Sequence, residues 1–226
     1  GIQNVLVYID DLLLHSGHHP EHLKLLDDVL FRLVNNGIKM NLKKCIFGSP
    51  EVTYLGFQLT REGIKPGQDK LKAVADFKPP SNTREVRQFL GLCNFFRAHI
   101  RDFAKIASPL TELTRKECPR KAGPLPDKAH QAFKDLQQAL VSEPVVAYPR
   151  RGLQYALTTD ACTGTEDHPG GIGAILTQID KDGNHHALGY ASRKLTDYEK
   201  NYTPFLLEMT GCLWGIDHFK YYLKGR

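Results

Sequence analysis

Two adjacent aspartates, Asp10 and Asp11, stand between two short apolar runs near the start of the sequence. The runs, residues 5–8 and 12–14, predict a β-hairpin with the carboxylates at its tip. Neighbouring carboxylates repel each other and are costly to desolvate unless a cation or solvent relieves them. Phosphoryl transfer by two metals supplies such a cation, since Mg²⁺ binds carboxylate and phosphate oxygens. An acidic turn without chemistry is the simpler alternative, because aspartate is favoured in turns.

The elements that follow can hold this hairpin in place. Pro20 opens a helix with apolar residues at helical spacing through Leu33, and Gly37 is placed to cap its end. A second hairpin combines residues 52–55 with residues 57–60. The first sixty residues are therefore predicted to form two hairpins and one helix.

A further helix is predicted after a Pro-Pro break. Asn82 can cap its start, and Glu85 three positions later completes a capping pattern. On one side of this helix Arg87, Gly91 and Phe95 form a ridge at i, i+4 and i+8. At least one of the adjacent aromatic residues at the end of the helix is expected to pack inward.

The positive charge of the chain gathers in its middle. The whole sequence has a formal net charge of +5, but residues 61–121 carry 14 basic and 7 acidic groups. The segments before and after are close to neutral. A basic stretch between neutral segments indicates contact with nucleic acid, and the alternative is a solvated helical face.

The last hundred residues predict a mixed α/β domain. Residues 115–126 have the composition of a linker, and a helix begins at Asp127. Strands are predicted at residues 145–148, 155–159, 172–178 and 187–191, and a final helix runs from about Pro204 to Tyr222.

Composition excludes several classes of protein. The 226 residues are 41% hydrophobic and 24% charged, which suits a folded core. No apolar run reaches the ~18 residues of a membrane span, and no signal peptide opens the chain. The five cysteines are scattered without a CxxC pair, which argues against a disulfide framework and favours a reducing compartment. Because the chain starts without Met, inside an apolar pattern, we expect both ends to be cuts through a larger protein.

Ordered motifs resemble one known family. Tyr8-Ile9-Asp10-Asp11 resembles the YxDD box of reverse transcriptases. The motifs that follow resemble, in order, those of gypsy-class LTR retrotransposon Pol polyproteins: Gly37-Ile38-Lys39-Met40-Asn41, Val52-Thr53-Tyr54-Leu55-Gly56, residues 86–97, Thr158-Thr159-Asp160-Ala161, residues 171–178 and residues 190–195. The resemblance covers essentially the whole chain.

The resemblance implies an α+β, mixed α/β chain in four parts. Residues 1–66 would be the end of a reverse transcriptase palm, and residues 67–114 a helical thumb. Residues 115–144 would be a linker with a lead-in helix, and residues 145–226 the N-terminal part of a ribonuclease H-like domain.

The resemblance also implies roles for polymerase residues. Asp10 and Asp11 would be catalytic metal ligands beside Tyr8, with the family's third aspartate on an earlier strand. A primer-grip hairpin would contain Tyr54, Leu55, Gly56 and Phe57. The ridge of Arg87, Gly91 and Phe95 would follow the minor groove of the duplex, where a glycine permits close approach.

In the ribonuclease H-like part, Asp160 and Glu208 would be catalytic and share a metal pair with carboxylates located beyond Arg226. Asp217 is no substitute, because nine residues at ~100° each turn it away from Glu208. Residues 161–170 form a longer connection than the family's usual turn, and we expect an exposed loop there, with two acids and a histidine.

The implied parent protein is an RNA-directed DNA polymerase and RNA–DNA hybrid ribonuclease that uses Mg²⁺, with Mn²⁺ as a substitute. Its partners would be RNA template, DNA primer, deoxynucleotides, the hybrid, and the protease and integrase parts of the polyprotein, without a membrane. A cytoplasmic particle is suggested by the resemblance alone, and these 226 residues are expected to be inactive by themselves. The alternative is a domesticated or degenerate element-derived protein that binds nucleic acid through a structural, non-catalytic ribonuclease H-like domain.

Overall fold

A computed structural model describes residues 2–115, 123–142, 144–165 and 169–224. The chain divides into two compact units, one of Gly1–Leu55 with Leu59–Arg61 and the other of Gly56–Gln58 with Glu62–Arg226. Among the described residues, no helix is both long and apolar enough to cross a bilayer.

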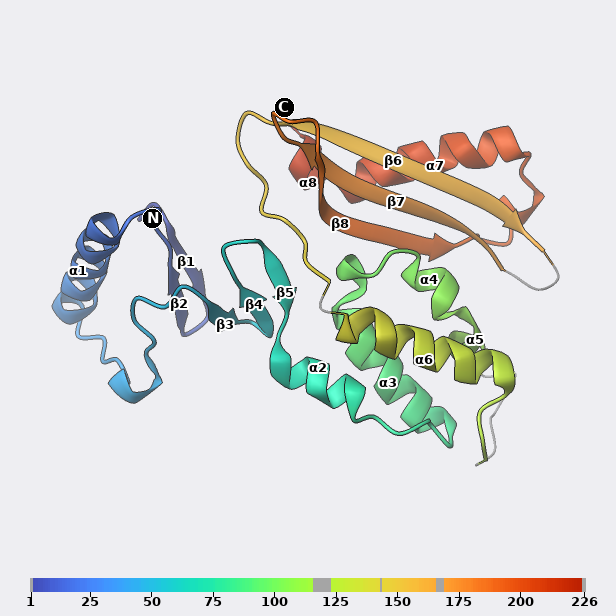
Figure 1. Ribbon diagram of the computed structural model, residues 1–226, viewed down its shortest axis with the longest axis horizontal. Coiled ribbons are helices and arrows are strands. Elements are labelled where there is room, and N and C mark those ends of the chain that lie inside the picture. The colour runs from blue at the N-terminus through green and yellow to red at the C-terminus, as the bar shows by residue number, and fades with distance from the viewer. Residues whose placement is uncertain (1, 116–122, 143, 166–168, 225–226) are drawn as a thin grey trace. The chain divides into compact units, whose positions relative to one another are not determined.

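The first unit begins with the predicted hairpin. Strands β1 (Val5–Tyr8) and β2 (Asp11–Leu14) pair antiparallel, with Tyr8 opposite Asp11 (Figure 1). Helix α1 (His19–Asn35) follows with a proline in its first turn, and the 3₁₀ helix η1 spans Leu42–Lys44. The expected C-terminal glycine lies just beyond α1, where Gly37 has a φ of 69°. The hairpin and helix predicted from the sequence are confirmed.

A short three-stranded sheet follows in the order β3-β4-β5. Its strands are β3 (Val52–Tyr54), β4 (Phe57–Leu59) and β5 (Ile64–Pro66). Two residues, Leu55 and Gly56, connect β3 to β4, and both have positive φ. That is the backbone of a tight two-residue hairpin, whose twist matches that of the flanking strands.

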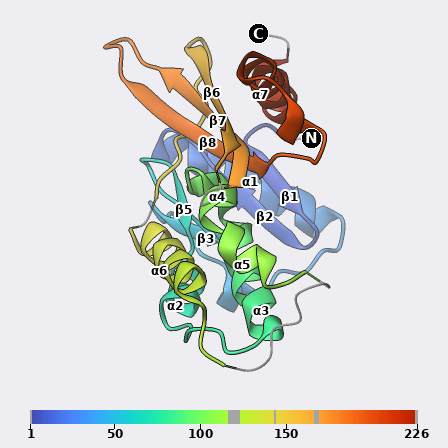
Figure 2. The same ribbon diagram turned by 90° about the vertical axis from the view of Figure 1, so that its right-hand side faces the viewer.

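The second unit contains a bundle of short helices with its own core, the helical bundle (Figure 2). It comprises α2 (Gln68–Ala75), α3 (Thr83–Phe95), η2 (Arg97–His99), α4 (Phe103–Ile106), α5 (Ser108–Glu112) and α6 (Asp127–Val141). Phe89, Phe96 and Leu136 are completely buried in this core. The predicted cap of α3 is confirmed, because the Glu85 backbone N–H donates to Asn82 Oδ1 at 3.0 Å.

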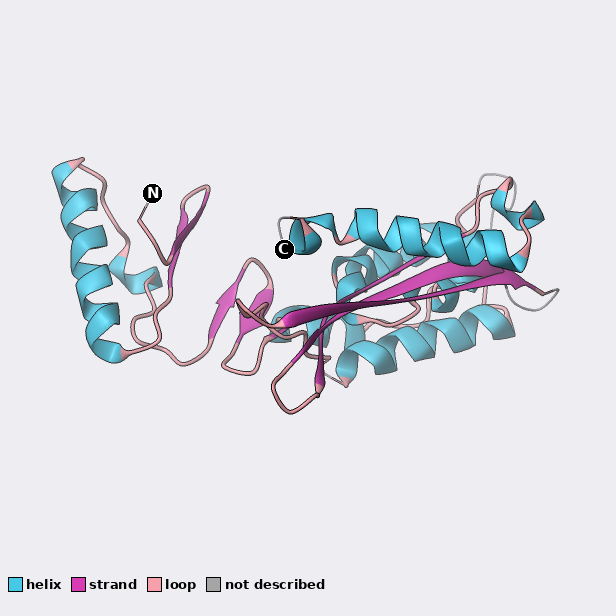
Figure 3. Ribbon diagram, turned by 90° about the horizontal axis from the view of Figure 1, so that it is seen from above, coloured by secondary structure: helices cyan, strands magenta, loops and turns pink. Residues whose placement is uncertain are grey.

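An antiparallel sheet with one long covering helix completes the second unit (Figure 3). Strands β6 (Gln154–Gly164), β7 (Pro169–Ile179) and β8 (His185–Lys194) lie in sequence order, followed by η3 (Glu199–Asn201), α7 (Pro204–His218) and α8 (Lys220–Leu223). Helix α7 packs closely on β6, since a Cβ at Gly215 would lie 3.0 Å from the Thr159 methyl group. The order β6-β7-β8 leaves β6 at one edge of the described sheet.

Two sequence-based expectations differ from the structure. The strand predicted at residues 145–148 is reduced to an isolated bridge between Val146 and Ile64. The loop expected at residues 161–170 is largely strand, because β6 continues through Gly164 and β7 begins at Pro169. Hydrogen bonding along the hairpin continues the two strands into this polar segment. The acids and the histidine expected there, at residues 166–168, lie outside the described residues.

The helical bundle and the sheet are joined through Ser192 of β8, which we call the bundle–sheet joint. Arg97 Nη2 donates a 2.7 Å hydrogen bond to the Ser192 carbonyl. The Ala104 backbone N–H donates to Ser192 Oγ at 2.9 Å. Nearby, Lys194 Nζ lies 3.3 Å from Glu112 Oε1. Helix α4 therefore covers the sheet on the side away from α7 (Figure 1).

A largely buried ion pair anchors the chain between β8 and α7. Arg193 donates two hydrogen bonds to Glu199, both of 2.7 Å, and the Thr196 backbone N–H donates to the same carboxylate at 2.8 Å. The guanidinium also lies 5.4 Å from the ring of Trp214. The hydrogen bonds from Arg193 lower the pKa of Glu199 to about 2, so the carboxylate stays ionised.

Candidate nucleic-acid and metal sites

The first candidate site is the tip of the β1–β2 hairpin. Tyr8, Asp10 and Asp11 are exposed there, and the turn consists of Ile9 and Asp10. Ile9 has a φ of 55° and is 84% exposed. A β-branched residue is rarely found in this left-handed region, which costs about 1–3 kcal/mol and is characteristic of functional sites. The strained turn presents the two carboxylates to solvent.

Asp10 and Asp11 suit a divalent cation by their chemistry. They offer only carboxylate oxygens, the ligands that Mg²⁺ prefers. Within the described part of the chain, neither aspartate has an ion-pair partner. Two adjacent unpaired carboxylates on a fixed turn therefore fit the role of metal ligands. No group of three His, Cys, Asp or Glu residues that could hold a metal by itself occurs among the described residues.

The second candidate site is the turn between β3 and β4, with Tyr54, Leu55, Gly56 and Phe57. Gly56 is tightly enclosed, because a Cβ there would lie 2.9 Å from Lys70 Cε and 3.3 Å from the Phe95 ring. The Gly67 backbone N–H also donates to the Gly56 carbonyl at 3.0 Å. Only glycine combines the positive φ with this close contact.

Aromatic rings fix the start of β4 against the helical bundle. The ring of Phe57 stacks on Phe95 at 4.9 Å between centroids and on His99 at 5.6 Å, and it meets Phe96 edge-on. Such ring pairs stabilise a structure by about 0.5–1.5 kcal/mol each beyond burial. Burial lowers the pKa of His99, which keeps its imidazole neutral in this cluster. Phe96 packs inward, whereas Phe95 remains 41% exposed.

The predicted ridge on α3 borders a groove of about 480 Å³. Gly91 and Phe95 line it together with Lys70, whose ammonium lies 3.7 Å from the Phe95 ring centroid. A Cβ at Gly91 would meet nothing within 4 Å, so the groove is open above that residue. Arg87 is exposed, and its Nη2 donates to the Thr114 carbonyl at 3.0 Å. The sequence did not predict a role for Lys70, whose one signal was its place in the basic stretch of residues 61–121.

The carboxylates Asp160 and Glu208 lie on either side of β6. Thr159 faces α7, since its hydroxyl lies 3.2 Å from Cys212 Sγ, and side chains alternate along a strand. Asp160 therefore faces away from α7. Glu208 lies one helical turn before Cys212, so it is on the same side of α7 as Cys212, the side that runs alongside β6. The structure places these two exposed carboxylates on opposite faces of the edge strand, without a third described ligand.

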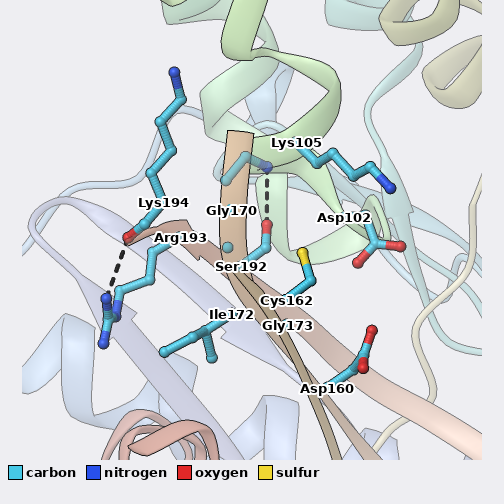
Figure 4. A pocket seen from close by; sticks show the side chains of 12 residues that line it. Asp102, Lys105, Asp160, Cys162, Gly170, Ile172, Gly173, Ser192, Arg193 and Lys194 are labelled. Atoms are coloured by element: carbon cyan, nitrogen blue, oxygen red, sulfur yellow. Dashed lines mark hydrogen bonds between the residues drawn. The ribbon is translucent and has the colours of Figure 1, made fainter. Parts of the chain in front are cut away.

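Asp160 opens into a shallow polar pocket between the sheet and α4 (Figure 4). Asp102 and Lys105 from the helical bundle border this pocket, and Cys162 lies beside Asp160. Asp102 has a φ of 55°, and its Oδ1 is 3.2 Å from the position of a Cβ at Gly173. Sequence reasoning missed Asp102 and Lys105, because nothing in the local pattern links them to a strand some sixty residues later.

Comparison with known families identifies the class of protein. Residues 2–59 match the family described as reverse transcriptase (RNA-dependent DNA polymerase). Residues 125–226 match the RNase H-like domain found in reverse transcriptase. The carboxylate hairpin thus lies in a reverse transcriptase sequence, and the sheet with α7 lies in an RNase H-like one.

Curated relatives name the family more closely. The Pol polyprotein of transposon opus from Drosophila melanogaster is 36% identical over 227 aligned residues, which cover 97% of this chain and 22% of the relative. That of transposon 297 is 33% identical over 99% of this chain and 20% of the relative. The Tf2-3 polyprotein of Schizosaccharomyces pombe is 32% identical over 98% and 16%. The chain belongs with the retrotransposon Pol polyproteins and spans about a fifth of the length of these relatives.

Solved structures agree in fold. A foamy viral protease-reverse transcriptase dRH in complex with double-stranded DNA matches with a TM-score of 0.84 and 22% identity, over 99% of this chain and 38% of that chain. The foamy viral protease-reverse transcriptase in complex with RNA/DNA hybrid matches with a TM-score of 0.81 and 22% identity, over 97% and 28%. The mixed α/β fold expected from the sequence is confirmed. Polymerases and nucleases of these kinds use divalent metal ions.

Proposed function

We propose that the protein containing this chain copies RNA into DNA, and that Asp10 and Asp11 hold the catalytic Mg²⁺ ions, with Mn²⁺ as a substitute. The observation that carries this proposal is the strained turn at Ile9, which exposes two unpaired carboxylates inside the reverse transcriptase match. Bound cations would neutralise charge on the attacking and leaving oxygens of the nucleotide transfer. The antiparallel pairing of β1 with β2 presents both carboxylates at the same turn. Tyr8, which is exposed beside them, would contact the primer end or the incoming deoxynucleotide.

The Leu55–Gly56 turn, with Tyr54 and Phe57 on either side, would hold the primer strand. Stacking of Phe57 on Phe95 supports this assignment, because it fixes the turn relative to α3. The open groove above Gly91 would accept the duplex backbone. Arg87 would add a positive charge from the same ridge, in a segment with a net charge of +7. RNA template and DNA primer are the proposed nucleic-acid partners, and protease and integrase parts of the same polyprotein are the proposed protein partners.

The RNase H-like part would cleave the RNA strand of the RNA–DNA hybrid. Asp160 and Glu208 lie on opposite faces of β6, so a metal pair that used both would lie at the open edge of this strand, where further carboxylates would complete it. Asp160 from β6 and Glu208 from α7 would be two of the ligands that hold these ions. We propose residues 1–66 as palm, 67–114 as thumb, 115–144 as linker with lead-in helix and 145–226 as the RNase H-like part.

Primer extension by the parent protein tests the polymerase assignment. We expect Asp10→Asn and Asp11→Asn each to reduce extension at least about a hundredfold, because each removes a charged metal ligand. Asp182→Asn makes the same chemical change in an exposed turn and should leave extension unchanged. Near-normal extension by either hairpin variant would refute the assignment.

Cleavage of a labelled hybrid tests the second activity separately. We expect Asp160→Asn and Glu208→Gln to abolish cleavage while primer extension persists. Cleavage that neither change affects would leave the RNase H-like part with a structural role only.

A further inference from the structure

The pocket beside Asp160 is built by both halves of the second unit (Figure 4). Strands β6 and β7 form its floor, β8 forms one wall, and the short helix α4 of the helical bundle forms the other. Its lining is mainly polar, and it is open to solvent on the side where Asp160 is exposed. The pocket therefore combines a proposed catalytic carboxylate with side chains from outside the RNase H-like match.

Two glycines of β7 leave part of the pocket floor without side chains. Gly173 pairs with Asp160 across the β6–β7 ladder, and Gly171 pairs with Cys162. A Cβ at Gly173 would lie 3.2 Å from Asp102 Oδ1, and one at Gly171 would lie 3.1 Å from the Arg193 carbonyl oxygen. The two glycines therefore make room for Asp102 and for the Arg193 carbonyl beside the strand that carries Asp160.

Of the cations around the pocket, Lys105 is unpaired. Arg193 is bound by Glu199, and Lys194 lies 3.3 Å from Glu112. The Lys105 backbone N–H donates to the Asp102 carbonyl at 2.9 Å, but its ammonium group has no ion-pair partner in the described part of the chain. Its side chain is exposed at the rim of the pocket.

The position of Lys105 is nevertheless fixed. The residue before it, Ala104, donates its backbone N–H to Ser192 Oγ at 2.9 Å. The residue two positions earlier, Phe103, is buried in the core of the helical bundle. A flexible side chain on a fixed backbone can reach an anion in the pocket without further rearrangement of α4.

We propose that Lys105 binds the phosphodiester backbone of the RNA–DNA hybrid at the Asp160 pocket, so that the helical bundle supplies part of the substrate-binding surface of the RNase H-like part. This inference rests on the proposed hybrid cleavage. The ligand class follows from the charges: a phosphate beside Asp102 and Asp160 requires a compensating cation, and Lys105 provides one from the opposite wall.

Hybrid binding to the parent protein tests the proposal, measured without divalent metal so that no strand is cut. We expect Lys105→Met to weaken binding about two- to fivefold, as for an exposed charge contact. The slope of log affinity against log salt should fall by about one unit. Lys105→Arg should restore both values. Lys181→Met, in the exposed β7–β8 turn, is the matched control and should change neither.

Alkylation of Cys162 gives a second readout inside the pocket. Saturating hybrid should slow its reaction with iodoacetamide several-fold in the wild-type protein, followed by peptide mass spectrometry. Unchanged affinity and salt slope in Lys105→Met, or unprotected Cys162, would overturn the proposal. If Asp160→Asn still abolishes cleavage in that case, the proposed activity stands and only the role of Lys105 fails. If Asp160→Asn retains cleavage, the proposed activity itself fails.

Discussion

Replacing Gly91 by alanine should raise stability and weaken nucleic-acid binding at the same time. Gly91 lies inside α3, where glycine costs about 1 kcal/mol relative to alanine. A Cβ there meets nothing within 4 Å, so no steric conflict offsets the gain. For a chain of this size, 1 kcal/mol corresponds to an increase in Tm of about 2–4 °C.

The new methyl group would point into the groove that we propose for the duplex. If the duplex backbone contacts Gly91, the methyl group displaces it, at a cost comparable to overpacking a core, about 1–3 kcal/mol. That cost corresponds to at least about a fivefold loss of duplex affinity. Stability and binding should therefore change in opposite directions, which general loss of folding cannot produce.

Thermal melting measures stability, and a binding titration measures duplex affinity. Primer extension during a single encounter of enzyme and duplex measures extension length. Gln138→Ala, at an exposed position of α6 outside the groove lining, is the control and should leave binding and extension length unchanged. If Gly91→Ala raises Tm but leaves affinity and extension length unchanged, the duplex does not lie in this groove. A lowered Tm would refute the reasoning about open space above the glycine.

Three further changes test the structure. Glu199→Gln should lower the free energy of unfolding at pH 7 by about 2–3 kcal/mol in urea titrations, because Arg193 loses its partner. The pKa of Glu199 is about 2 in the folded protein and ordinarily 4.5, so the stabilisation by its carboxylate is complete above pH 4.5 and is lost as the pH falls toward 2. A difference in unfolding free energy between wild type and Glu199→Gln that persists undiminished at low pH would contradict this reasoning. Gly215→Ala should lower Tm despite its better helix propensity, since its Cβ would crowd β6, and an increase would argue against that packing. Gly56→Ala would place a Cβ at a φ of 82° and 2.9 Å from Lys70 Cε, so we expect the free energy of unfolding to fall by at least about 1 kcal/mol and primer extension to become shorter. Unchanged stability and unchanged extension would contradict a fixed turn.

Local sequence signals predicted the elements well. The capping pattern of Asn82 and Glu85 gave the start of α3, because cap hydrogen bonds depend on residues three positions apart. The apolar runs at residues 52–55 and 57–60 predicted a second hairpin, and the structure places Leu55 with Gly56 in its turn. The expected strand at residues 145–148 was wrong in extent, since strand pairing depends on distant partners, here Ile64 for Val146 and Ala187 for Ala147.

The sequence indicates which residues are candidates for the sites, but not their backbone conformation or their neighbours in space. Adjacency and the resemblance make Asp10 and Asp11 candidates, and their role stays a prediction. The left-handed conformation of Ile9 could not be predicted, because a β-branched residue disfavours it. The position of Asp160 beside Lys105 depends on how the helical bundle packs on the sheet. That packing is set by long-range contacts, which a local pattern does not contain.

The bundle–sheet joint affects how such elements can exchange parts by recombination. Ser192 receives one hydrogen bond at its carbonyl and another at its hydroxyl, both from the helical bundle. A crossover between residues 115 and 145 would pair a bundle with a foreign sheet, and a sheet without a hydroxyl at this position would lose the hydrogen bond from the Ala104 amide. A recombinant whose sheet provides a hydroxyl at this position therefore keeps both hydrogen bonds of the joint, whereas one without it keeps only the bond from Arg97.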